Sequence, residues 1–328
     1  MRKLLLTMFA AVALLGCNKE DVPVSPQEQH AITFGTVDTR AGLADLQDNG
    51  FGVWAFINND EAQNYLLMEN QYVEYDNGSW VYSPAKYWIE NTIFSFVGVY
   101  PYAENSPYFS ADTTNAAVKL TVSNTPSDVD FLMATYAVDT NEEYSTIVPL
   151  QFQHLLTSVG LKIWRDGAKH QNDQMRIKKV TLSNIRKAGT LSSGSDSWEY
   201  TNDRLTIVKE NDEILNANEI GAAVTNDDGS FVTGGEAATL IQMMLLPQSI
   251  DDKNSVSLRI EYEIKRNNAV DWEYAELEAS IPNSTWLASN RYTYNVVLSS
   301  VTDITVYYIL TKVDQWGTPQ VGGTVIIK

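Results

Sequence analysis

The strongest constraint on the fold of this chain is a period of two in its apolar residues. It is clearest between Val256 and Lys265, where every second residue, beginning with Val256, is apolar and the residues between are polar or charged. Successive side chains of a β-strand point to opposite faces of its sheet, so this spacing predicts a strand with one buried face and one wet face. A surface helix would instead need apolar residues three and four positions apart.

Other segments share this spacing or are apolar throughout, as buried strands are. The expected strands are 51–56, two within 72–83, 93–100, 180–185, 240–246, 256–264, 272–281, 292–298 and 323–328. Asp76-Asn77-Gly78 is a strong hairpin signal within 72–83. One or two helical turns are expected within 61–69, and polar loops at 186–204 and 225–236. With no long amphipathic helix, the pattern predicts an all-β chain of two β-sandwiches in tandem, divided near residue 150.

The N-terminus reads as an export signal. Arg2 and Lys3 precede an apolar stretch, 4–15, that is shorter than the roughly 20 helical residues needed to span a bilayer. The following Leu-Leu-Gly-Cys17 resembles a bacterial lipobox, in which the cysteine is diacylated and becomes the first mature residue; the alternative is a plain signal peptide with an incidental cysteine. Cys17 is the only cysteine, so an intramolecular disulfide is excluded and burial must hold the fold.

Residues 18–30 are expected to form a polar tether. Within it, Asn18-Lys19-Glu20-Asp21 resembles the signal that sends Bacteroidetes lipoproteins to the outer face of the outer membrane; otherwise it is only a linker. Loss of Arg2 and Lys3 with the signal would change the formal charge from −18 to −20. So acidic a surface repels phosphate backbones, which argues against nucleic acid as a partner.

The sequence offers little support for an enzyme. His30 lies in the tether, His170 in a polar loop and His154 between apolar neighbours, where a structural role is expected, and none has partners at metal-ligand spacing. The acidic pairs 142–143 and 251–252 could serve a glycosidase, but neighbouring side chains on a strand face opposite ways and such pairs arise by chance among 41 acidic residues. Residues 226–229 resemble a calcium loop without its closing glutamate. We predict no catalytic residue, no metal and no cofactor.

Ten short motifs, each weak alone, stand in the order found in one family. They are the lipobox at Cys17, Ile32-Thr-Phe34 with Thr39-Arg40-Ala41, Phe51-Gly-Val-Trp54, Pro84-Ala-Lys-Tyr-Trp88 before Phe94-x-Phe96, Tyr100-Pro101, Asp130-Phe-Leu-Met133, Leu150-x-Phe-x-His154-Leu, Leu245-Leu-Pro-Gln248, Trp286 with Arg291-Tyr-x-Tyr294, and Trp316. Together they resemble the fimbrillin-type pilins of Bacteroidetes, the subunits of type V pili, over essentially the whole chain.

The resemblance implies a lipoprotein signal at 1–17, a tether at 18–30, and two transthyretin-like β-sandwich domains at 31–150 and 151–328. It also implies that a trypsin-like surface protease cuts between Arg40 and Ala41 and releases the first strand, 31–40, together with its lipid. A neighbour's C-terminal strand would then fill the opened groove by β-augmentation, in which backbone pairing gives affinity and alternate side chains fill pockets.

The residues are compatible with this mechanism. Ile32 and Phe34 alternate as groove-filling side chains, and Val37 follows a little later. The donor segment would be the apolar run Val325, Ile326 and Ile327, which is short for a donor arm.

The implied partners are other pilin subunits in a homo- or heteropolymer, the outer membrane through the lipid before maturation, the protease, and a host or bacterial surface ligand. The implied location is the outer membrane and then a cell-surface fimbrium. A stalk subunit and a tip subunit would share these features. The alternative function is a surface glycan-binding lipoprotein that does not polymerise.

Overall fold

The computed structural model describes residues 30–36, 43–58, 63–142, 144–210, 214, 220–225, 231–233, 239–299 and 304–312. Within these residues the first half of the chain contributes ten strands and one helix. They are β1 (Thr33–Thr36), α1 (Leu43–Asn49), β2 (Phe51–Asn58), β3 (Tyr65–Asp76), β4 (Ser79–Val81), β5 (Ile93–Tyr100), β6 (Phe109–Asp112), β7 (Ala117–Val122), β8 (Leu132–Asp139), β9 (Ile147–Leu150) and β10 (Gln153–His154).

The second half of the chain contributes strands only, again within the described residues. They are β11 (Thr157–Asp166), β12 (Gln174–Arg186), β13 (Gly189–Ser192), β14 (Glu199–Tyr200), β15 (Arg204–Glu210), β16 (Ala222–Thr225), β17 (Phe231–Thr233), β18 (Thr239–Leu245), β19 (Gln248–Ile250), β20 (Ser257–Lys265), β21 (Glu273–Ser280), β22 (Ser284–Trp286), β23 (Asn290–Leu298) and β24 (Ile304–Lys312). The prediction of an all-β chain is confirmed.

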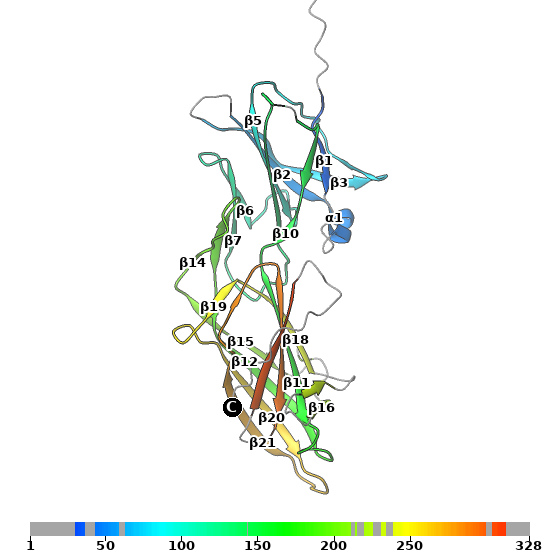
Figure 1. Ribbon diagram of the computed structural model, residues 1–328, viewed down its shortest axis with the longest axis vertical. Helices are drawn as coiled ribbons and strands as arrows, with labels where there is room; N and C mark the ends of the chain where they lie inside the picture. Colours follow the sequence, from blue (N-terminus) through cyan, green and yellow to red (C-terminus); the bar gives the residue numbers. More distant parts are fainter. Residues whose placement is uncertain are drawn as a thin grey trace, which may run out of the picture.

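The strands build an elongated molecule, with β1 to β5 at one end and β12, β20 and β21 at the other (Figure 1). The end that holds β1 to β5 is called the upper half below, and the other the lower half. None of the helices among the described residues is long and apolar enough to cross a membrane.

The expected helical turns within 61–69 are wrong in the described part of that segment, because β3 begins at Tyr65. The backbone there pairs antiparallel with β2, and Met68, opposite Ala55, is buried. The helix lies earlier, at α1, where Leu46 is fully buried. It ends at Gly50, whose N–H donates to the carbonyl of Leu46 and whose positive φ of 69° suits a helix C-terminus.

The upper half has three layers. Its central sheet has the strand order β10-β8-β5-β2-β3-β4. On β2, Phe51 and Val53 belong to one apolar core, and Trp54 and Phe56 belong to the core on the opposite face. The first core is closed by the two-stranded sheet β1-β9, and the second by the sheet β14-β13-β7-β6. Covering on both faces explains why β2 and β5 carry apolar residues on both of their faces.

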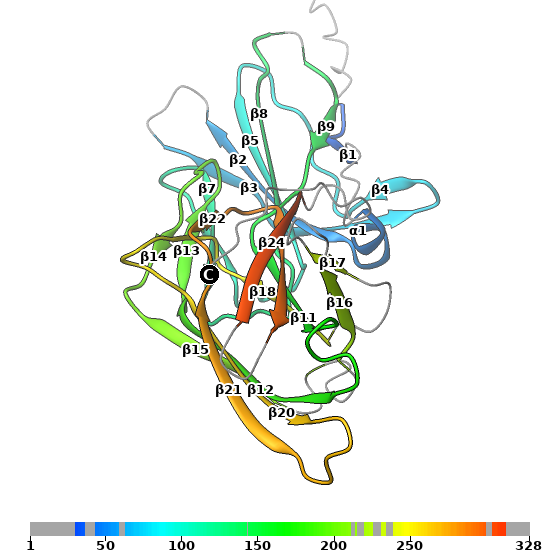
Figure 2. The ribbon, with the colours of Figure 1, turned by 60° about the horizontal axis from the view of Figure 1, so that its bottom comes forward.

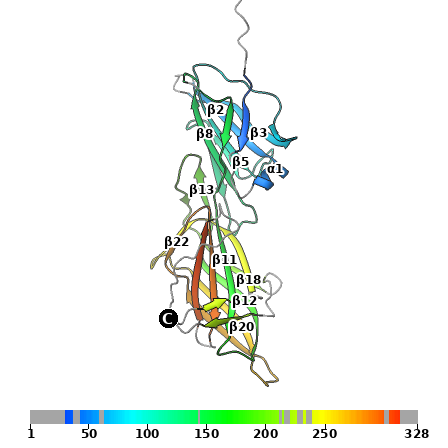
Figure 3. The same ribbon diagram turned by 45° about the vertical axis from the view of Figure 1, so that its right-hand side comes forward.

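A segment from the second half of the chain completes this upper half. β13 pairs antiparallel with β7, from Gly189 opposite Val122 to Ser192 opposite Lys119, and β14 pairs with β13. In Figure 3, β13 lies beside the upper strands and above the lower half. The expected loop at 186–204 is therefore wrong, and so is the one at 225–236 where β17 forms. The division near residue 150 stays a prediction, and the pairing of β13 with β7 crosses it.

The lower half is built from two larger sheets and one core. One sheet has the order β17-β16-β11-β23-β24, with β18 also paired to β11, and the other has the order β15-β12-β20-β21. The alternation in β20 is confirmed, since Leu258, Ile260, Tyr262 and Ile264 are all fully buried. The same core contains residues of β11, β12, β18 and β23, so the two sheets pack face to face around it.

Candidate functional site

The first strand, β1, places two apolar side chains in the upper core. Ile32, just before the strand, is 1% exposed and Phe34 is 6% exposed, whereas Thr33 between them is exposed. The expected inward alternation of Ile32 and Phe34 is therefore what the structure shows. Both belong to the core that β1 and β9 close over the central sheet.

The main chain around β1 is hydrogen-bonded on both sides. On one side β1 runs parallel to β9, with Thr33 opposite Ile147 and Thr36 opposite Leu150; Figure 2 shows the two strands side by side. On the other side the pairing is antiparallel: the N–H of Ile32 donates to the carbonyl of Lys86 at 2.9 Å. The N–H of Trp88 donates to the carbonyl of His30 at 3.1 Å. The strand thus fills a slot between β9 and the segment 86–88.

The ring of Phe34 lies among three other aromatic rings. Its centroid is 5.4 Å from that of Tyr82, 6.2 Å from that of Phe96 and 6.4 Å from that of Phe51. The contacts with Phe51 and Phe96 are edge-to-face, the arrangement that aromatic pairs favour. Because Phe51 and Phe96 come from the central sheet, the ring of Phe34 contributes directly to the core of the upper half.

Tyr82 and Trp88 form the outer wall of this slot. The hydroxyl of Tyr82 donates to the carbonyl of Ile32 at 2.9 Å and accepts the N–H of Lys86 at 3.2 Å. Burial raises the pKa of this hydroxyl, so it stays a donor throughout the neutral range. The indole N–H of Trp88 donates to the carbonyl of Thr146 at 3.3 Å, across the slot next to β9. Trp88 is 7% exposed and belongs to the same core as Phe34.

The remaining predicted site residues lie outside the described residues. They are Cys17, Val37, Arg40, Ala41, Val325, Ile326 and Ile327. In the sequence, Arg40 falls between the end of β1 at Thr36 and the start of α1 at Leu43.

The buried histidines have structural partners. Nδ1 of His154 lies 2.6 Å from Oδ2 of Asp130, in agreement with the structural role expected for it. His170 does lie in a loop, but it is only 3% exposed, which the sequence did not indicate. Its Nδ1 lies 2.9 Å from Oδ2 of Asp173 and its Nε2 lies 3.2 Å from the carbonyl oxygen of Ser299. Among the described residues, no group of three or more metal-ligating side chains is close enough to hold an ion.

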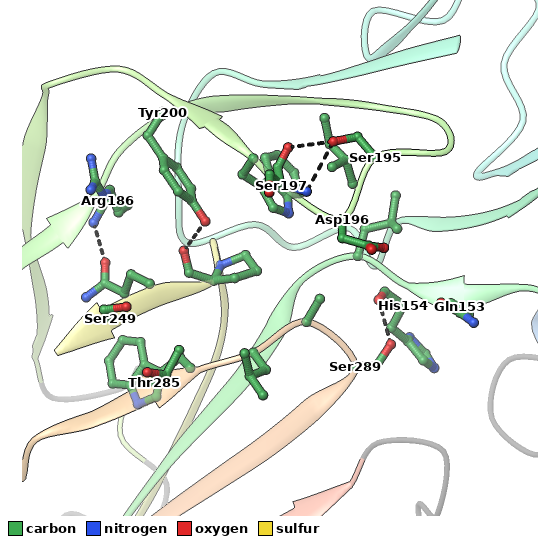
Figure 4. Close-up of a pocket in the computed structure, with 18 of the residues that line it drawn as sticks. Gln153, His154, Arg186, Ser195, Asp196, Ser197, Tyr200, Ser249, Thr285 and Ser289 are labelled. Atoms are coloured by element: carbon green, nitrogen blue, oxygen red, sulfur yellow. Dashed lines mark hydrogen bonds between the residues drawn. The ribbon is translucent and has the colours of Figure 1, made fainter. Parts of the chain in front are cut away.

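A pocket of about 710 Å³ lies at the junction of the two halves (Figure 4). Its lining includes residues of β10, the β13–β14 turn, β19, β22 and the loop between β22 and β23; six of them are Gln153, Asp196, Trp198, Gln248, Thr285 and Ser289. The hydroxyl of Tyr200 donates to the carbonyl of Pro247 at 2.6 Å, and Ser289 Oγ donates to the carbonyl of His154 at 2.7 Å. These bonds join the halves, and sequence reasoning missed the pocket because it took 186–204 for a loop.

Comparison with known proteins supports one family. The structure is similar to that of a fimbrial protein from Bacteroides vulgatus, at 17% identity and a TM-score of 0.65, covering 86% of this chain and 99% of that one. It is also similar to a candidate cell adhesion protein from Bacteroides uniformis, at 14% identity and a TM-score of 0.51, covering 86% and 98%. At these identities the likeness shows a shared fold. No curated protein matches the sequence. The family model described as fimbrillin-like matches residues 39–316, and the chain therefore belongs to the fimbrillin-like family.

Proposed function

We propose that this fimbrial subunit is exported as a lipoprotein on Cys17, is cut after Arg40, and then joins other subunits by strand exchange. Membership of the fimbrillin-like family makes it a structural protein of a cell-surface appendage rather than an enzyme. Assembly with other pilin subunits follows from the same family. The lipid anchor, the cut after Arg40 and the strand exchange go beyond family membership and are proposals.

The observation that carries the proposal is the slot filled by β1. β1 pairs with β9, and residues 30–32 just before it pair with segment 86–88. This stretch buries Ile32 and Phe34 and is followed in the sequence by Arg40 before α1 begins. A cut after Arg40 would therefore free all of β1 while leaving α1 and the central sheet on the subunit. Its departure would leave unpaired main-chain groups along β9 and segment 86–88, which an incoming strand can satisfy.

The energy of burial favours exchange over simple loss of the strand. Full burial of two large apolar side chains stabilises a fold by roughly 3 to 6 kcal/mol, before any hydrogen bonds are counted. A cut first strand would thus remain seated until another strand takes its place. Exchange also keeps the apolar slot away from water at every stage.

Limited digestion with trypsin tests the proposal. The protein expressed from residue 18 is digested, and fragment masses and particle sizes are followed together. We expect one early cut after Arg40 and then, once other fimbrial subunits are added, a ladder of oligomers. Arg40→Gln should abolish both, whereas the matched change Lys187→Gln, at an exposed position outside the slot, should leave both intact.

Two further results would separate the parts of the proposal. Deletion of 325–328 should remove the oligomers without affecting the cut if that segment is the donor. A protein that is cut after Arg40 but stays monomeric, even at high concentration and with other fimbrial subunits added, would rule out strand exchange. Labelling with radioactive palmitate, compared between the natural chain and Cys17→Ala, tests the lipid anchor.

A second candidate function is glycan binding by the monomer, and the junction pocket is the observation that favours it. Its volume lies within the usual range for small-ligand sites, and it combines the ring of Trp198 with the polar side chains of Gln153 and Asp196. Trp198→Ala should then abolish binding on a glycan array and leave the oligomers unchanged. Binding by the uncut monomer with no oligomers after cleavage would favour this function over polymerisation.

A further inference from the structure

We infer that the slot filled by β1 selects an incoming strand by a pattern of four successive residues: a branched aliphatic residue, any residue, an aromatic residue and a small residue. We infer further that this strand comes from a protein other than this chain. The inference rests on the proposed strand exchange and goes beyond it, because it states which donor the slot accepts. It also resolves the choice between a homopolymer and a heteropolymer that the sequence left open.

The first two requirements come from the side chains that β1 buries. Ile32 is almost completely enclosed, and Phe34 completes a cluster with the rings of Phe51, Tyr82 and Phe96. An aliphatic side chain at the Phe34 position would leave part of that space empty and would lose the edge-to-face contacts. Thr33 is exposed, and its hydroxyl donates an exposed hydrogen bond to the carbonyl of Thr146 at 3.2 Å. Loss of such a bond costs about 1 kcal/mol or less, so the residue between the two buried positions can vary at small cost.

The requirement for a small residue at the fourth position is set by β9, which lines one side of the slot. A β-carbon placed on Gly35 would lie 3.0 Å from Cγ2 of Ile147, closer than such atoms normally approach. Ile147 is 52% exposed, so its side chain has room to move, and this requirement is weaker than the requirement for an aromatic residue. Glycine at this position meets it without any movement.

The remaining contacts set direction and carry no sequence preference. The incoming strand must run parallel to β9, as β1 does, and its preceding residues must run antiparallel to segment 86–88, as residues 30–32 do. The hydroxyl of Tyr82 binds the carbonyl of Ile32, a group that every residue carries. Main-chain bonds thus supply general affinity, and the Ile32 and Phe34 positions supply the selection.

This chain carries no second copy of the pattern. In the printed sequence, Ile32-Thr-Phe-Gly35 is the only place where Ile, Val or Leu is followed two residues later by an aromatic residue and then by Gly, Ala or Ser. The segment 325–327 is Val-Ile-Ile and has no aromatic residue to replace Phe34. A homopolymer joined through it would leave the aromatic cluster incomplete.

The other apolar segment near the end of the sequence is also a poor match. It contains Val306-Tyr-Tyr308, but Ile309 would then occupy the position of Gly35, next to Ile147. Moreover, it belongs to β24, which pairs with β23 over nine residues, from Asn290 opposite Lys312 to Leu298 opposite Ile304. Donation would require all of that pairing to be broken first.

Peptide competition tests the inference on the protein cut after Arg40. A fluorescent peptide of residues 30–38 is allowed to exchange into the cut protein, and unlabelled competitors then displace it. The competitors are the same peptide, its Phe34→Ala form, its Thr33→Ala form as the matched control, and the peptides 320–328 and 303–312. We expect the natural and Thr33→Ala peptides to compete within about fivefold of each other, since only the exposed Thr33 hydroxyl bond is lost, and the Phe34→Ala peptide and both C-terminal peptides to be weaker by roughly 100-fold.

The outcomes distinguish this inference from the function beneath it. If no peptide enters the cut protein, strand exchange itself fails and the inference fails with it. If the natural peptide enters but the Phe34→Ala peptide or the 320–328 peptide competes equally well, strand exchange stands and the selection is wrong. The expected ranking supports both, and it predicts that the cut protein alone forms oligomers less readily than it does with a second subunit that carries the pattern.

Discussion

The hydroxyl of Tyr82 donates a 2.9 Å hydrogen bond to the carbonyl oxygen of Ile32. Tyr82 lies in the loop after β4, 50 residues away along the chain, and its ring also contacts that of Phe34. One side chain therefore holds both the backbone and the aromatic group of the first strand, which makes it the most direct means of loosening that strand.

Tyr82→Phe should loosen the first strand while keeping the ring contact. It removes the hydroxyl that the carbonyl of Ile32 and the N–H of Lys86 use, and a lost bond of this kind costs about 1 to 2 kcal/mol. Urea unfolding should show that loss, and amide exchange should speed up at Ile32. Tyr87→Phe, the same change at a ring that is 43% exposed, is the control and should alter neither quantity. Equal effects of the two changes would contradict the role given to Tyr82.

Gly98→Ala should destabilise the upper half by overpacking. A β-carbon at Gly98 would lie 2.8 Å from Cζ of Phe152 and 3.0 Å from Cδ1 of Leu150. Overpacking of a close-packed core costs about 1 to 3 kcal/mol. Gly160→Ala is the matched control, because Gly160 also lies in a strand and its nearest neighbour would be at 3.6 Å. Thermal unfolding should show a clear drop in Tm for Gly98→Ala only; a drop of similar size in both would show that loss of glycine, and not crowding, is the cause.

His170→Ala should destabilise the lower half. The imidazole joins the loop after β11 to the end of β23, through Asp173 on one side and the carbonyl of Ser299 on the other. Its removal leaves the partners without those bonds and opens a small void, at a cost of about 2 to 4 kcal/mol. Lys169→Ala changes a neighbouring side chain that is 57% exposed, and should have little effect. Urea unfolding measures both; a loss below half a kcal/mol for His170→Ala would contradict the structural role.

Part of the stability should disappear in acid because of Asp112. Hydrogen bonds from Lys119 and Asn115 lower the pKa of this carboxyl from 3.8 to about 2. A group whose pKa is lower in the folded state contributes stability above its unfolded pKa and loses it as pH falls toward the folded one. The loss should therefore occur between pH 4 and pH 2, and Asp112→Asn should make it smaller. Carbon-13 NMR of the carboxyl group measures the pKa directly; a midpoint near 4 would contradict the prediction.

Much of the fold follows from local patterns. The alternation in β20 predicted its buried face residue by residue, because the pleat alone decides which side chains point inward. The hairpin at Asp76-Asn77-Gly78 formed as expected, with Asn77 and Gly78 in the positive-φ conformations that such turns require. Ile32 and Phe34 were also predictable, since their spacing is that of a half-buried strand.

What the sequence did not predict depends on contacts between distant residues. Leu191 is an isolated aliphatic residue in a mostly polar stretch, and its burial in the core that contains Leu120 of β7, opposite it in the sheet, could not be read from its neighbours in sequence. Nothing near His170 in the sequence points to Ser299, 129 residues later, so its burial was missed. The slot itself was only half predictable: β1 was expected, but its partners β9, Tyr82 and segment 86–88 were not.

The crossing of β13 into the upper half has a consequence for how the chain can fold during export. The upper half lacks two strands of one of its sheets until Tyr200 has been delivered, although most of its residues precede Leu150. The edge of β7 that pairs with β13 therefore stays unpaired while about 70 residues of later sequence, 123–192, are delivered. A chaperone that shields this edge during that interval would raise the yield of folded subunit, and a fragment ending at residue 150 would need such help permanently.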